Sequence, residues 1–419
     1  MTALLPAAQH LDREVGVIGT PRLFAGLDHA PLVGFGAHQA RHGRLPLPTA
    51  DRLVTLADGA RLAGRGGAGY PVAAKLRATP RATTVVVNGH ESEPASLKDR
   101  VLMRRAPHLV IDGALVVAAA VGAREIVMTV SDPLARHALV AACNDRHDAA
   151  AVRIVAAHGA FVAGEARAVV RALDGQPAVP PGRRILPSVR GVGGRPTFLS
   201  NAETFAQLAV LVRLGVAAFG HTGQSAEPGT TLVTVSGAVG HPGVLEIPSG
   251  LPVDVVLRTA AAAPPAALVV GGYHGAWLPV DPSLRLSRGG VAAAGGTFGA
   301  GVVGVVGTDT CALGELARVT GWLAEQSARQ CGPCLNGLPA LAATVEALYR
   351  GRRDDGSAAV LADLVDGRGA CAHPDGAARF VRSGLRVLAD ELATHADGGC
   401  GRPVLGQLPL PASSSGDAA

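Results

Sequence analysis

The chain of 419 residues has few aromatic side chains, which make up 3% of it. Its cores must therefore be built from alanine, valine and leucine, and few rings are available to stack on a planar ligand. Hydrophobic residues reach 48%, so a chain of this length can form two or three folded domains. The net charge of +5 comes from arginines interspersed with acids rather than from a basic stripe, which argues against a nucleic-acid partner.

Long hydrophobic runs are also missing. No stretch of 18 uncharged apolar residues occurs, and the N-terminus has no basic region followed by an apolar core. We therefore expect no transmembrane segment and no secretory signal. The expected location is the cytoplasm, including the inner face of a membrane if a partner holds the chain there. In that reducing compartment the six cysteines are not expected to form a disulfide framework, so metal or cluster ligation is the open question.

Residues 64–75 form the most informative segment. The loop consists of Gly64, Arg65, Gly66, Gly67, Ala68 and Gly69, and Lys75 follows it. Glycine permits positive φ and a close approach of the backbone to a ligand, and a helix expected to begin near Pro71 turns its positive end toward the same place. We therefore predict a site for a phosphorylated cofactor. The glycine spacing matches the dinucleotide-binding fingerprint, but that fingerprint follows a strand and no strand is expected here, so an ordinary Rossmann site is disfavoured. The alternative to a cofactor site is an ordinary glycine-rich turn that binds no ligand.

Hydrophobic patterns further along the chain predict alternating strands and helices. Strands are expected at 84–88, 125–130 and 152–155, and helices at 109–121, 166–173 and 201–212. This alternation indicates an α/β fold with a parallel sheet. Two β-branched runs around the turn at 240–243 predict a hairpin in a small β-grasp unit. Helices expected at 313–326, 338–349, 358–366 and 377–394 predict a C-terminal helical bundle.

These elements give five expected segments. They are an N-terminal extension over 1–45, an α/β cofactor-binding domain over 46–220, a β-grasp domain over 225–300, a helical metal-binding domain over 310–400 and a disordered tail over 401–419. The tail assignment rests on its proline and serine content.

Three cysteines have spacing that points to a metal centre. Cys331 and Cys334 are three residues apart and can share one centre, and Cys371 can close it from another helix. Thiolates are the usual ligands of iron–sulfur clusters, whereas zinc would need a second pair or histidines at ligand spacing. A redox dithiol is the other alternative, but that motif normally follows a strand. The remaining cysteines, Cys143, Cys311 and Cys400, are interpreted as isolated, inert thiols.

Four motifs in one order resemble those of a known family. They are the segments 64–75, 87–100, 164–165 with 200–204, and Cys331-x-x-Cys334 with Cys371. In this order they resemble the NADH-binding flavoprotein subunit of respiratory complex I, whose relatives occur in NAD-reducing hydrogenases and NAD-dependent formate dehydrogenases. The resemblance covers roughly residues 45–395. The hairpin at 233–247 resembles the soluble-ligand-binding β-grasp unit of that family.

The resemblance implies an FMN-binding α/β domain, a small β-grasp domain and an iron–sulfur-binding helical bundle. It implies that FMN is held by the 64–75 loop and lined by Asn88, Glu91, Glu93, Gly164, Glu165, Ser200, Asn201 and Thr204. Of these, Glu93 and Glu165 are the catalytic candidates. The cluster, of the 4Fe-4S or 3Fe-4S type, would be held by Cys331, Cys334 and Cys371. In this family NADH reduces the flavin, and electrons leave singly through the cluster.

The sequence departs from the family pattern at several positions. The first cysteine of the usual cluster motif is replaced by Ala328, so only three ligands remain; His373, Cys311 and Cys400 are candidate substitutes. On the nucleotide side, the residues that replace family aromatic, acidic or hydroxyl groups are Ala78, Leu186, Ala166, His90 and Phe161. Each lost stacking contact costs on the order of 1 kcal/mol, so we expect weak use of NADH.

Two function classes follow. The first is an electron-transfer flavoprotein that passes electrons between a two-electron donor and a one-electron iron–sulfur carrier. In the family that donor is NAD(H), and the carrier would be a ferredoxin-like protein or a membrane-bound redox partner. The second is a non-catalytic scaffold that keeps the fold without the cofactors. The intact glycine loop favours the first class, and the altered cluster and nucleotide positions favour the second.

Overall fold

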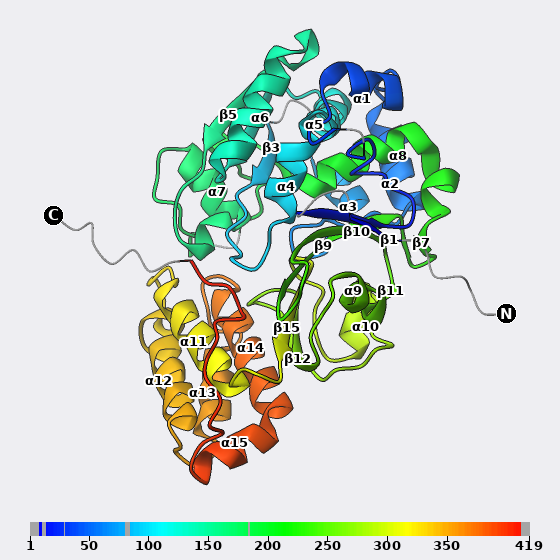
Figure 1. Cartoon of the computed structure of the whole chain (residues 1–419). Coiled ribbons are helices and arrows are strands. Elements are labelled where there is room, and N and C mark those ends of the chain that lie inside the picture. The colour runs from blue at the N-terminus through cyan, green and yellow to red at the C-terminus, as the bar shows by residue number, and fades with distance from the viewer. Residues whose placement is uncertain (1–7, 11–13, 29, 80–83, 183–184, 412–419) are drawn as a thin grey trace.

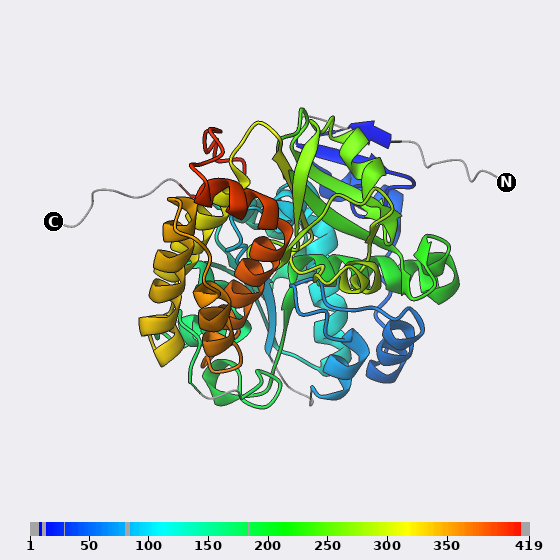
Figure 2. The same cartoon turned by 90° about the horizontal axis from the view of Figure 1, so that it is seen from below.

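The computed structural model describes residues 8–10, 14–28, 30–79, 84–182 and 185–411. Three units are visible in Figure 1: an α/β unit at the top, a mixed-sheet unit at the lower right and a helical unit at the lower left. Figure 2, seen from below, shows the mixed-sheet and helical units side by side against the α/β unit. All three units therefore meet at a central junction.

The α/β unit is built on a four-stranded parallel sheet with strand order β5-β4-β3-β6. The strands are β3 (Thr84–Gly89), β4 (Glu125–Val130), β5 (Val152–Ala156) and β6 (Thr197–Asn201). Successive side chains point to opposite faces of a strand. Val85 and Val87 accordingly join one buried cluster, whereas Val86 packs on Val169 and Val170 on the other face. The predicted α/β fold with a parallel sheet is confirmed.

Helices cover both faces of this sheet. The larger set consists of α1 (Phe35–His42), α2 (Ala50–Gly59), α3 (Val72–Arg77), α4 (Lys98–Arg105), α5 (Pro107–Val121), α6 (Pro133–Asn144) and α8 (Ala202–Gly220), and α7 (Ala166–Leu173) covers the second face. By length and composition α8 could cross a membrane, but 61% of its apolar window is buried and it packs closely on α5. We therefore describe α8 as a core helix of this unit.

The mixed-sheet unit contains seven strands in the order β1-β2-β10-β9-β15-β12-β13. They are β1 (Ala8–His10), β2 (Val15–Ile18), β9 (Thr230–Gly237), β10 (Gly243–Pro248), β12 (Pro265–Val270), β13 (Ala276–Leu278) and β15 (Val302–Gly307). The predicted hairpin is confirmed, because β9 and β10 pair antiparallel. Helices α9 (Val253–Thr259) and α10 (Arg288–Ala293) pack on one face of the mixed sheet. Two short strand pairs lie at its margins: β7 (Gly223–Gln224) with β8 (Glu227–Pro228), and β11 (Leu251–Pro252) with β14 (Arg285–Leu286).

The N-terminal region takes part in this sheet. Strand β2 pairs in parallel with β10, and Val15 and Val17 are buried. The segment expected as an N-terminal extension over residues 1–45 thus supplies β2 to the mixed sheet and also contains α1. The signal was weak because each element is short and β2 depends on a partner more than 220 residues away, as its register with Val244 shows.

The helical unit packs on the other face of the mixed sheet. Its helices are α11 (Ala312–Glu325), α12 (Leu338–Tyr349), α13 (Ser357–Val365), α14 (His373–Val387) and α15 (Ala389–Ala396). One helix was expected over 377–394, but the chain breaks at Leu388, where φ is −100° and ψ is 23°. This break turns α15 back toward the amino end of α11, which it contacts.

The segment after α15 is ordered, contrary to the expected disordered tail. Residues 402–411 run along the helical unit, visible as the red coil in Figure 1, and Leu408 is fully buried. The backbone N–H of Gln407 donates to Glu315 at 2.9 Å, and that of Leu405 donates to the Thr310 hydroxyl at 3.0 Å. Local composition did not reveal these contacts, because the partners lie about 90 residues upstream. Residues 412–419 lie outside the described residues.

A tight crossing of α5 and α8 gives a test of the fold. A Cβ at Gly113 would lie 1.9 Å from the Phe205 carbonyl oxygen, which is backbone and cannot move aside. We expect Gly113→Ala to lower the free energy of unfolding by about 3 kcal/mol or more in urea denaturation. The control is Gly321→Ala in α11, where nothing lies within 4 Å, and a gain of up to about 1 kcal/mol is expected. Equal effects of the two changes would contradict this packing.

Candidate functional site

The glycine loop lies between α2 and α3 rather than after a strand. Gly67 has φ +98° and Gly69 has φ +63°, a region that side chains disfavour. The N–H of Gly64 donates to the Tyr70 carbonyl at 2.9 Å and closes the loop. An added Cβ at Gly67 would meet only the backbone of Gly299, at 3.8 Å, so no side chain covers Gly67 closely. The loop is therefore an exposed backbone cradle of a different kind from the Rossmann turn, as expected.

Lys75 supplies a cation at the back of this loop. Its Nζ donates to the carbonyl oxygen of Leu199 at 2.9 Å, and within the described part of the chain it forms no ion pair with a carboxylate. Burial lowers the pKa of Lys75 to about 8. Its other described neighbour is the Phe198 ring, whose centroid lies 5.9 Å from Nζ. A half-buried ammonium group without an anionic partner gains from an added anion, so this environment suits a phosphate group.

A buried polar network fixes the loop to the rest of the α/β unit. The N–H of Arg65 donates to the Thr204 hydroxyl at 2.9 Å. Lys98 Nζ lies 2.9 Å from Asp99 and 3.0 Å from Glu203, and both carboxylates are buried. Asp99 in turn accepts from the Asn201 amide at 2.6 Å. These side chains satisfy one another, so Asn201 and Thr204 support the loop from beneath.

A cavity of about 550 Å³ opens beside the loop, at the junction of the three units. This size is typical of a cofactor pocket. The residues that line it and were expected at the site are Gly66, Gly67, Ala68, Glu93, Gly164, Glu165 and Cys371. Those expected at the site but not on the cavity wall are Gly64, Arg65, Gly69, Lys75, Asn88, Glu91, Ser200, Asn201, Thr204, Cys331 and Cys334. The second group lies mainly behind the loop or beyond Cys371.

Glu93 is the buried acid of this cavity. Its Oε2 accepts from the N–H of Tyr273 at 2.8 Å, and its Oε1 accepts from the N–H of Ala95 at 3.3 Å. Burial raises the pKa of Glu93 to about 7, and the two N–H groups offset part of that effect. Glu93 can therefore hold or release a proton near neutral pH inside the cavity.

The other polar candidates are already engaged. Asn88, at the carboxyl end of β3, donates to the Gly164 carbonyl at 2.9 Å and so fixes Gly164, which lines the cavity, to the sheet. Glu165 caps α7, accepting from the N–H of Arg167 at 3.0 Å, and pairs with the Arg167 side chain. Glu91 accepts from the N–H groups of Asp99 and Arg100 at 3.1 and 3.0 Å. Glu91 thus organises the start of α4 instead of lining the cavity.

The three predicted cluster cysteines gather where the helical unit meets the cavity. Cys334 sits in a π-helical turn over Pro333–Gly337, and Cys371 precedes α14; both are buried. Burial, followed by the nearby Cys331 and Cys371 thiols, raises the pKa of Cys334 to about 12. The backbone of Ala328 also reaches the Cys334 sulfur. The position expected for a fourth cysteine therefore lies beside the other three but offers no side-chain ligand.

A ring cluster that the sequence did not reveal lies where the cavity meets the helical unit, and its His274 and His373 line the cavity together with Cys371. His274 Nε2 lies 3.0 Å from His373 Nδ1, and His373 Nε2 lies 2.9 Å from the Leu323 carbonyl. Phe161 packs edge-on against His274 at 4.7 Å and against Trp322 at 5.3 Å. Since a carbonyl only accepts, His373 must donate from Nε2 and accept at Nδ1. Both nitrogens of His373 are thus engaged, which disfavours it as a fourth cluster ligand.

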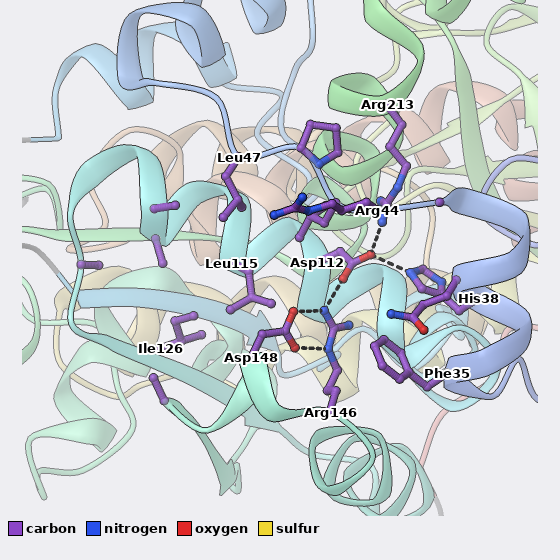
Figure 3. A pocket seen from close by; sticks show the side chains of 18 of the residues that line it. Phe35, His38, Arg44, Leu47, Asp112, Leu115, Ile126, Arg146, Asp148 and Arg213 are labelled. Atoms are coloured by element: carbon purple, nitrogen blue, oxygen red, sulfur yellow. Dashed lines mark hydrogen bonds and ion pairs between the residues drawn. The ribbon is translucent and has the colours of Figure 1, made fainter.

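A larger cavity of about 980 Å³ lies elsewhere, beside the amino end of β4 (Figure 3). Its wall carries Asp112, which pairs with His38 and Arg213 at 2.6 Å each and with Arg146 at 2.7 Å. These contacts hold the pKa of Asp112 well below its usual range despite burial. Ligands of open α/β sheets bind at the carboxyl ends of the strands. The motif-bearing cavity, and not this one, has that location.

The residues around the smaller cavity fit FMN. The glycine cradle, with Lys75 behind it, suits its phosphate, and the Gly164 carbonyl and the carboxyl groups of Glu93 and Glu165 on the cavity wall suit hydroxyls and ring nitrogens. A Cβ at Gly67 would meet only the backbone of Gly299, at 3.8 Å, so the glycine leaves room for a ligand on this wall.

The raised pKa of Glu93 predicts that the stability of the fold depends on pH. A carboxyl whose pKa rises from 4.5 to about 7 on folding stabilises the fold while it is protonated, and this stability is lost as pH rises through that range. We expect the unfolding free energy of the flavin-free chain to fall by about 2.5 kcal/mol between pH 5 and 8 relative to Glu93→Gln. Urea titrations at several pH values measure the difference. The control is Glu125→Gln, which changes a more exposed carboxyl group. If the unfolding free energy of Glu93→Gln depends on pH in parallel with that of wild type, the assignment is contradicted.

Comparison with known proteins agrees with this geometry. The family model described as the Nuo51 FMN-binding domain matches residues 58–210, and that of the NADH-ubiquinone oxidoreductase-F iron-sulfur binding region matches residues 314–395. The chain is similar to the NADH-quinone oxidoreductase F subunit of Mycobacterium tuberculosis (strain H37Rv), with 30% identity over 406 residues covering 87% of this chain and 89% of the relative. The corresponding F 2 subunit of Rhizobium meliloti (strain 1021) is 29% identical over 391 residues, covering 86% and 92%.

A solved structure is also similar. A chain of the NAD⁺-reducing [NiFe]-hydrogenase in the H₂-reduced state matches with a TM-score of 0.77 and 27% identity. The match covers 90% of this chain but only 66% of the hydrogenase chain. The glycine loop lies in the first matched region, and the three cysteines lie in the second. With the 30% identity to the Mycobacterium tuberculosis subunit over 87% of the chain, these matches show that the chain belongs to the family of the NADH-quinone oxidoreductase F subunit.

Proposed function

We propose that this chain is an electron-transfer flavoprotein subunit that passes electrons between a two-electron donor and a one-electron carrier through FMN and an iron–sulfur cluster. The observation that carries the proposal is a single cavity with Gly66 and Gly67 on one wall and Cys371 on another. A flavin in that cavity lies next to a cluster ligand. The chain is an oxidoreductase of the NADH dehydrogenase type by family, and both of its cofactor-binding regions are matched.

Different residues around the cavity would hold different parts of FMN. The loop backbone at Gly66, Gly67 and Ala68, with the ammonium group of Lys75 behind it, would hold the phosphate. Gly64 and Arg65 shape the loop, because their N–H groups already donate to Tyr70 and Thr204. Gly164 would meet the polar edge of the ring system, with Asn88 fixing its carbonyl, and Ser200, Asn201 and Thr204 would support the ribityl side from behind the cavity wall. When bound, FMN accepts electrons in pairs and gives them up singly, which no side chain can do.

Two acids are assigned catalytic roles of different kinds. Glu93 holds a proton inside the cavity near neutral pH, because burial raises its pKa to about 7. Glu165 is 32% exposed at its side chain and is oriented by the first turn of α7, so it faces an incoming donor at the open side. Phe161 and His274 pack edge-on at 4.7 Å and line the same cavity as Cys371.

The cluster is assigned to Cys331, Cys334 and Cys371. Ala328 leaves the fourth corner without its family ligand. Cys311 and Cys400 are too far away to replace it, because Cys311 precedes α11 and Cys331 follows it, and 14 helical residues span roughly 21 Å. A 3Fe-4S centre or a labile 4Fe-4S centre is therefore proposed.

NAD(H) is the proposed donor or acceptor, bound weakly. Leu186 is 61% exposed and Ala78 ends α3 at the surface, so neither offers a ring to stack on the nucleotide. The proposed partner is an iron–sulfur protein of the same assembly, in the cytoplasm or on the inner face of a membrane. The mixed-sheet unit between the two cofactor regions is assigned to the soluble-ligand-binding β-grasp type.

The flavin assignment is tested at Gly67. A valine there would have to adopt φ +98°, which strains a residue with a branched Cβ, and its side chain would project into the cradle, so Gly67→Val should abolish flavin retention after anaerobic reconstitution. The absorbance of the purified protein near the flavin band measures this. Gly175→Val is the control, because it carries a φ of +72° in open space away from the cavity and should keep the flavin. A wild-type chain without flavin, or a Gly67→Val chain that retains it, would contradict the assignment.

The cluster assignment is tested at Ala328. A cysteine at this position adds a fourth thiolate beside Cys334, and Ala328→Cys should convert a three-iron or labile centre into a stable four-iron cluster. Arg329 next to it adopts φ +50°, so the double variant Ala328→Cys/Arg329→Gly also removes local strain. Electron paramagnetic resonance and iron content distinguish the centres. A wild-type chain with a stable four-iron cluster that Ala328→Cys does not change would overturn the assignment.

A further inference from the structure

A second group of metal-ligand side chains lies at the far end of the helical unit. Cys311, Glu391, His395 and Cys400 each offer one ligand atom, and these atoms all lie within 4.8 Å of one another. Cys311 Sγ lies 3.3 Å from both Glu391 Oε1 and His395 Nε2, and His395 Nε2 lies 3.2 Å from Cys400 Sγ. The two cysteines interpreted from the sequence as isolated thiols are thus brought together, and that interpretation is wrong.

The elements of the fold aim these atoms at one point. Cys311 is the N-cap of α11, and its sulfur accepts from the N–H of Gly314 at 3.2 Å. Glu391 and His395 are four residues apart on α15, so they share one face of that helix. Cys400 follows shortly after α15 in a glycine-rich turn, where Gly398, Gly399 and Gly401 have positive φ.

The histidine is in the tautomer that a metal requires. His395 Nδ1 lies 2.6 Å from the Tyr349 carbonyl oxygen, which only accepts. Nδ1 therefore carries the proton, and the lone pair of Nε2 points at the two sulfur atoms. A ligating histidine usually donates its other ring nitrogen to a carbonyl or carboxylate in this way. His395 is 6% exposed, so the arrangement is shielded from water.

The carboxylate and its surroundings complete the charge balance. Glu391 Oε1 accepts from the N–H of Leu313 at 3.0 Å, and Oε2 accepts from Arg402 at 2.8 Å. Two thiolates and one carboxylate around a divalent cation leave one negative charge. The Arg402 guanidinium neutralises it, which offsets the cost of burying the group.

The group is separate from the cluster site. It lies at the start of α11 and, through Tyr349, at the end of α12, whereas Cys331 and Cys334 lie between the end of α11 and the start of α12. The two groups are therefore at opposite ends of the same helix pair.

We propose that Cys311, Glu391, His395 and Cys400 bind one zinc ion as a closed structural site. Zinc takes four ligands of sulfur, nitrogen and oxygen in a tetrahedron, and its bond lengths place neighbouring ligand atoms roughly 3.3–3.8 Å apart. The contacts of 3.2–3.3 Å are close to this spacing. Iron–sulfur clusters prefer four thiolates, and calcium and magnesium prefer oxygen, so the mixed donor set selects zinc.

The ion would fasten the ordered C-terminal segment to the helical unit. Cys400 begins the stretch that continues to Leu408 and Pro409, and Tyr273 beside the flavin cavity donates its hydroxyl to the Pro409 carbonyl at 2.6 Å. Zinc at one end of the segment and Tyr273 at the other would hold residues 400–409 along α11. The proposal does not depend on flavin or cluster binding.

The test is metal analysis of the full chain, purified with a non-thiol reductant and incubated with one equivalent of zinc before gel filtration. Wild type should carry about one zinc per chain, and X-ray absorption at the zinc edge should give two sulfur and two nitrogen or oxygen neighbours. Cys400→Ser, in a half-buried turn, and His395→Gln should lose this zinc. Cys143→Ser, a cysteine outside both groups, should keep it.

A double variant excludes zinc held by empty cluster cysteines. Cys331→Ser/Cys334→Ser should lose iron but keep one zinc per chain. The proposal is overturned if wild type binds no zinc, if Cys400→Ser retains a full equivalent, or if the absorption edge reports three or four sulfur neighbours. A Cys311–Cys400 disulfide in the reduced preparation, detected by mass spectrometry, would overturn it equally.

Discussion

The buried ion-pair network around Glu203 is the interaction on which the rest of the site depends. Glu203, in the first turn of α8, pairs with Lys98 of α4 and lies 3.8 Å from Arg65 of the glycine loop. It also accepts from the N–H of Leu232 in β9 at 3.1 Å. One carboxylate thus joins the loop, two helices and the mixed-sheet unit. Removing one partner from such a buried network costs about 3–5 kcal/mol, because the remaining charges lose their compensation.

This constraint explains why the cavity forms at the junction of the units. The network holds the glycine loop from behind, leaving the backbone of Gly66 and Gly67 free toward the front. Glu93 reaches the same cavity because the N–H of Tyr273, from the mixed-sheet unit, binds its carboxylate. The His274–His373 pair then links the cavity wall to the helical unit that carries Cys371. The path from loop to cysteines is short because all three units contribute to it.

The sequence was sufficient for the parts of the fold that rest on local pattern. Valine-rich runs predicted β3, β4 and β5, and the absence of a strand before Gly64 correctly separated this loop from a Rossmann turn. The cofactor regions could be recognised because each motif is contiguous. The roles of Glu91 and Glu165 were less predictable, since a carboxylate near a cofactor loop looks the same in sequence whether it faces the cavity or caps a helix.

Features that depend on contacts between residues far apart in the chain could not be predicted from the sequence. Strand β2 needs β10, the segment around Leu408 needs α11, and Cys311 meets Cys400 only because α15 turns back at Leu388. His274 gave no signal at all, because its role comes from the neighbouring His373 ring. In each case the deciding contact joins residues that are far apart in the chain.

The central claim is that electrons pass from the cavity to the cluster within this one chain. The most direct measurement is an anaerobic freeze-quench experiment on protein reconstituted with FMN, iron and sulfide. One equivalent of a two-electron donor is added, and flavin absorbance and the paramagnetic signal of the cluster are followed together. We predict that flavin bleaching is followed by cluster reduction in wild type, and that Cys371→Ser keeps the bleaching but loses the cluster signal. Flavin reduction without any electron reaching an assembled wild-type cluster would contradict the account.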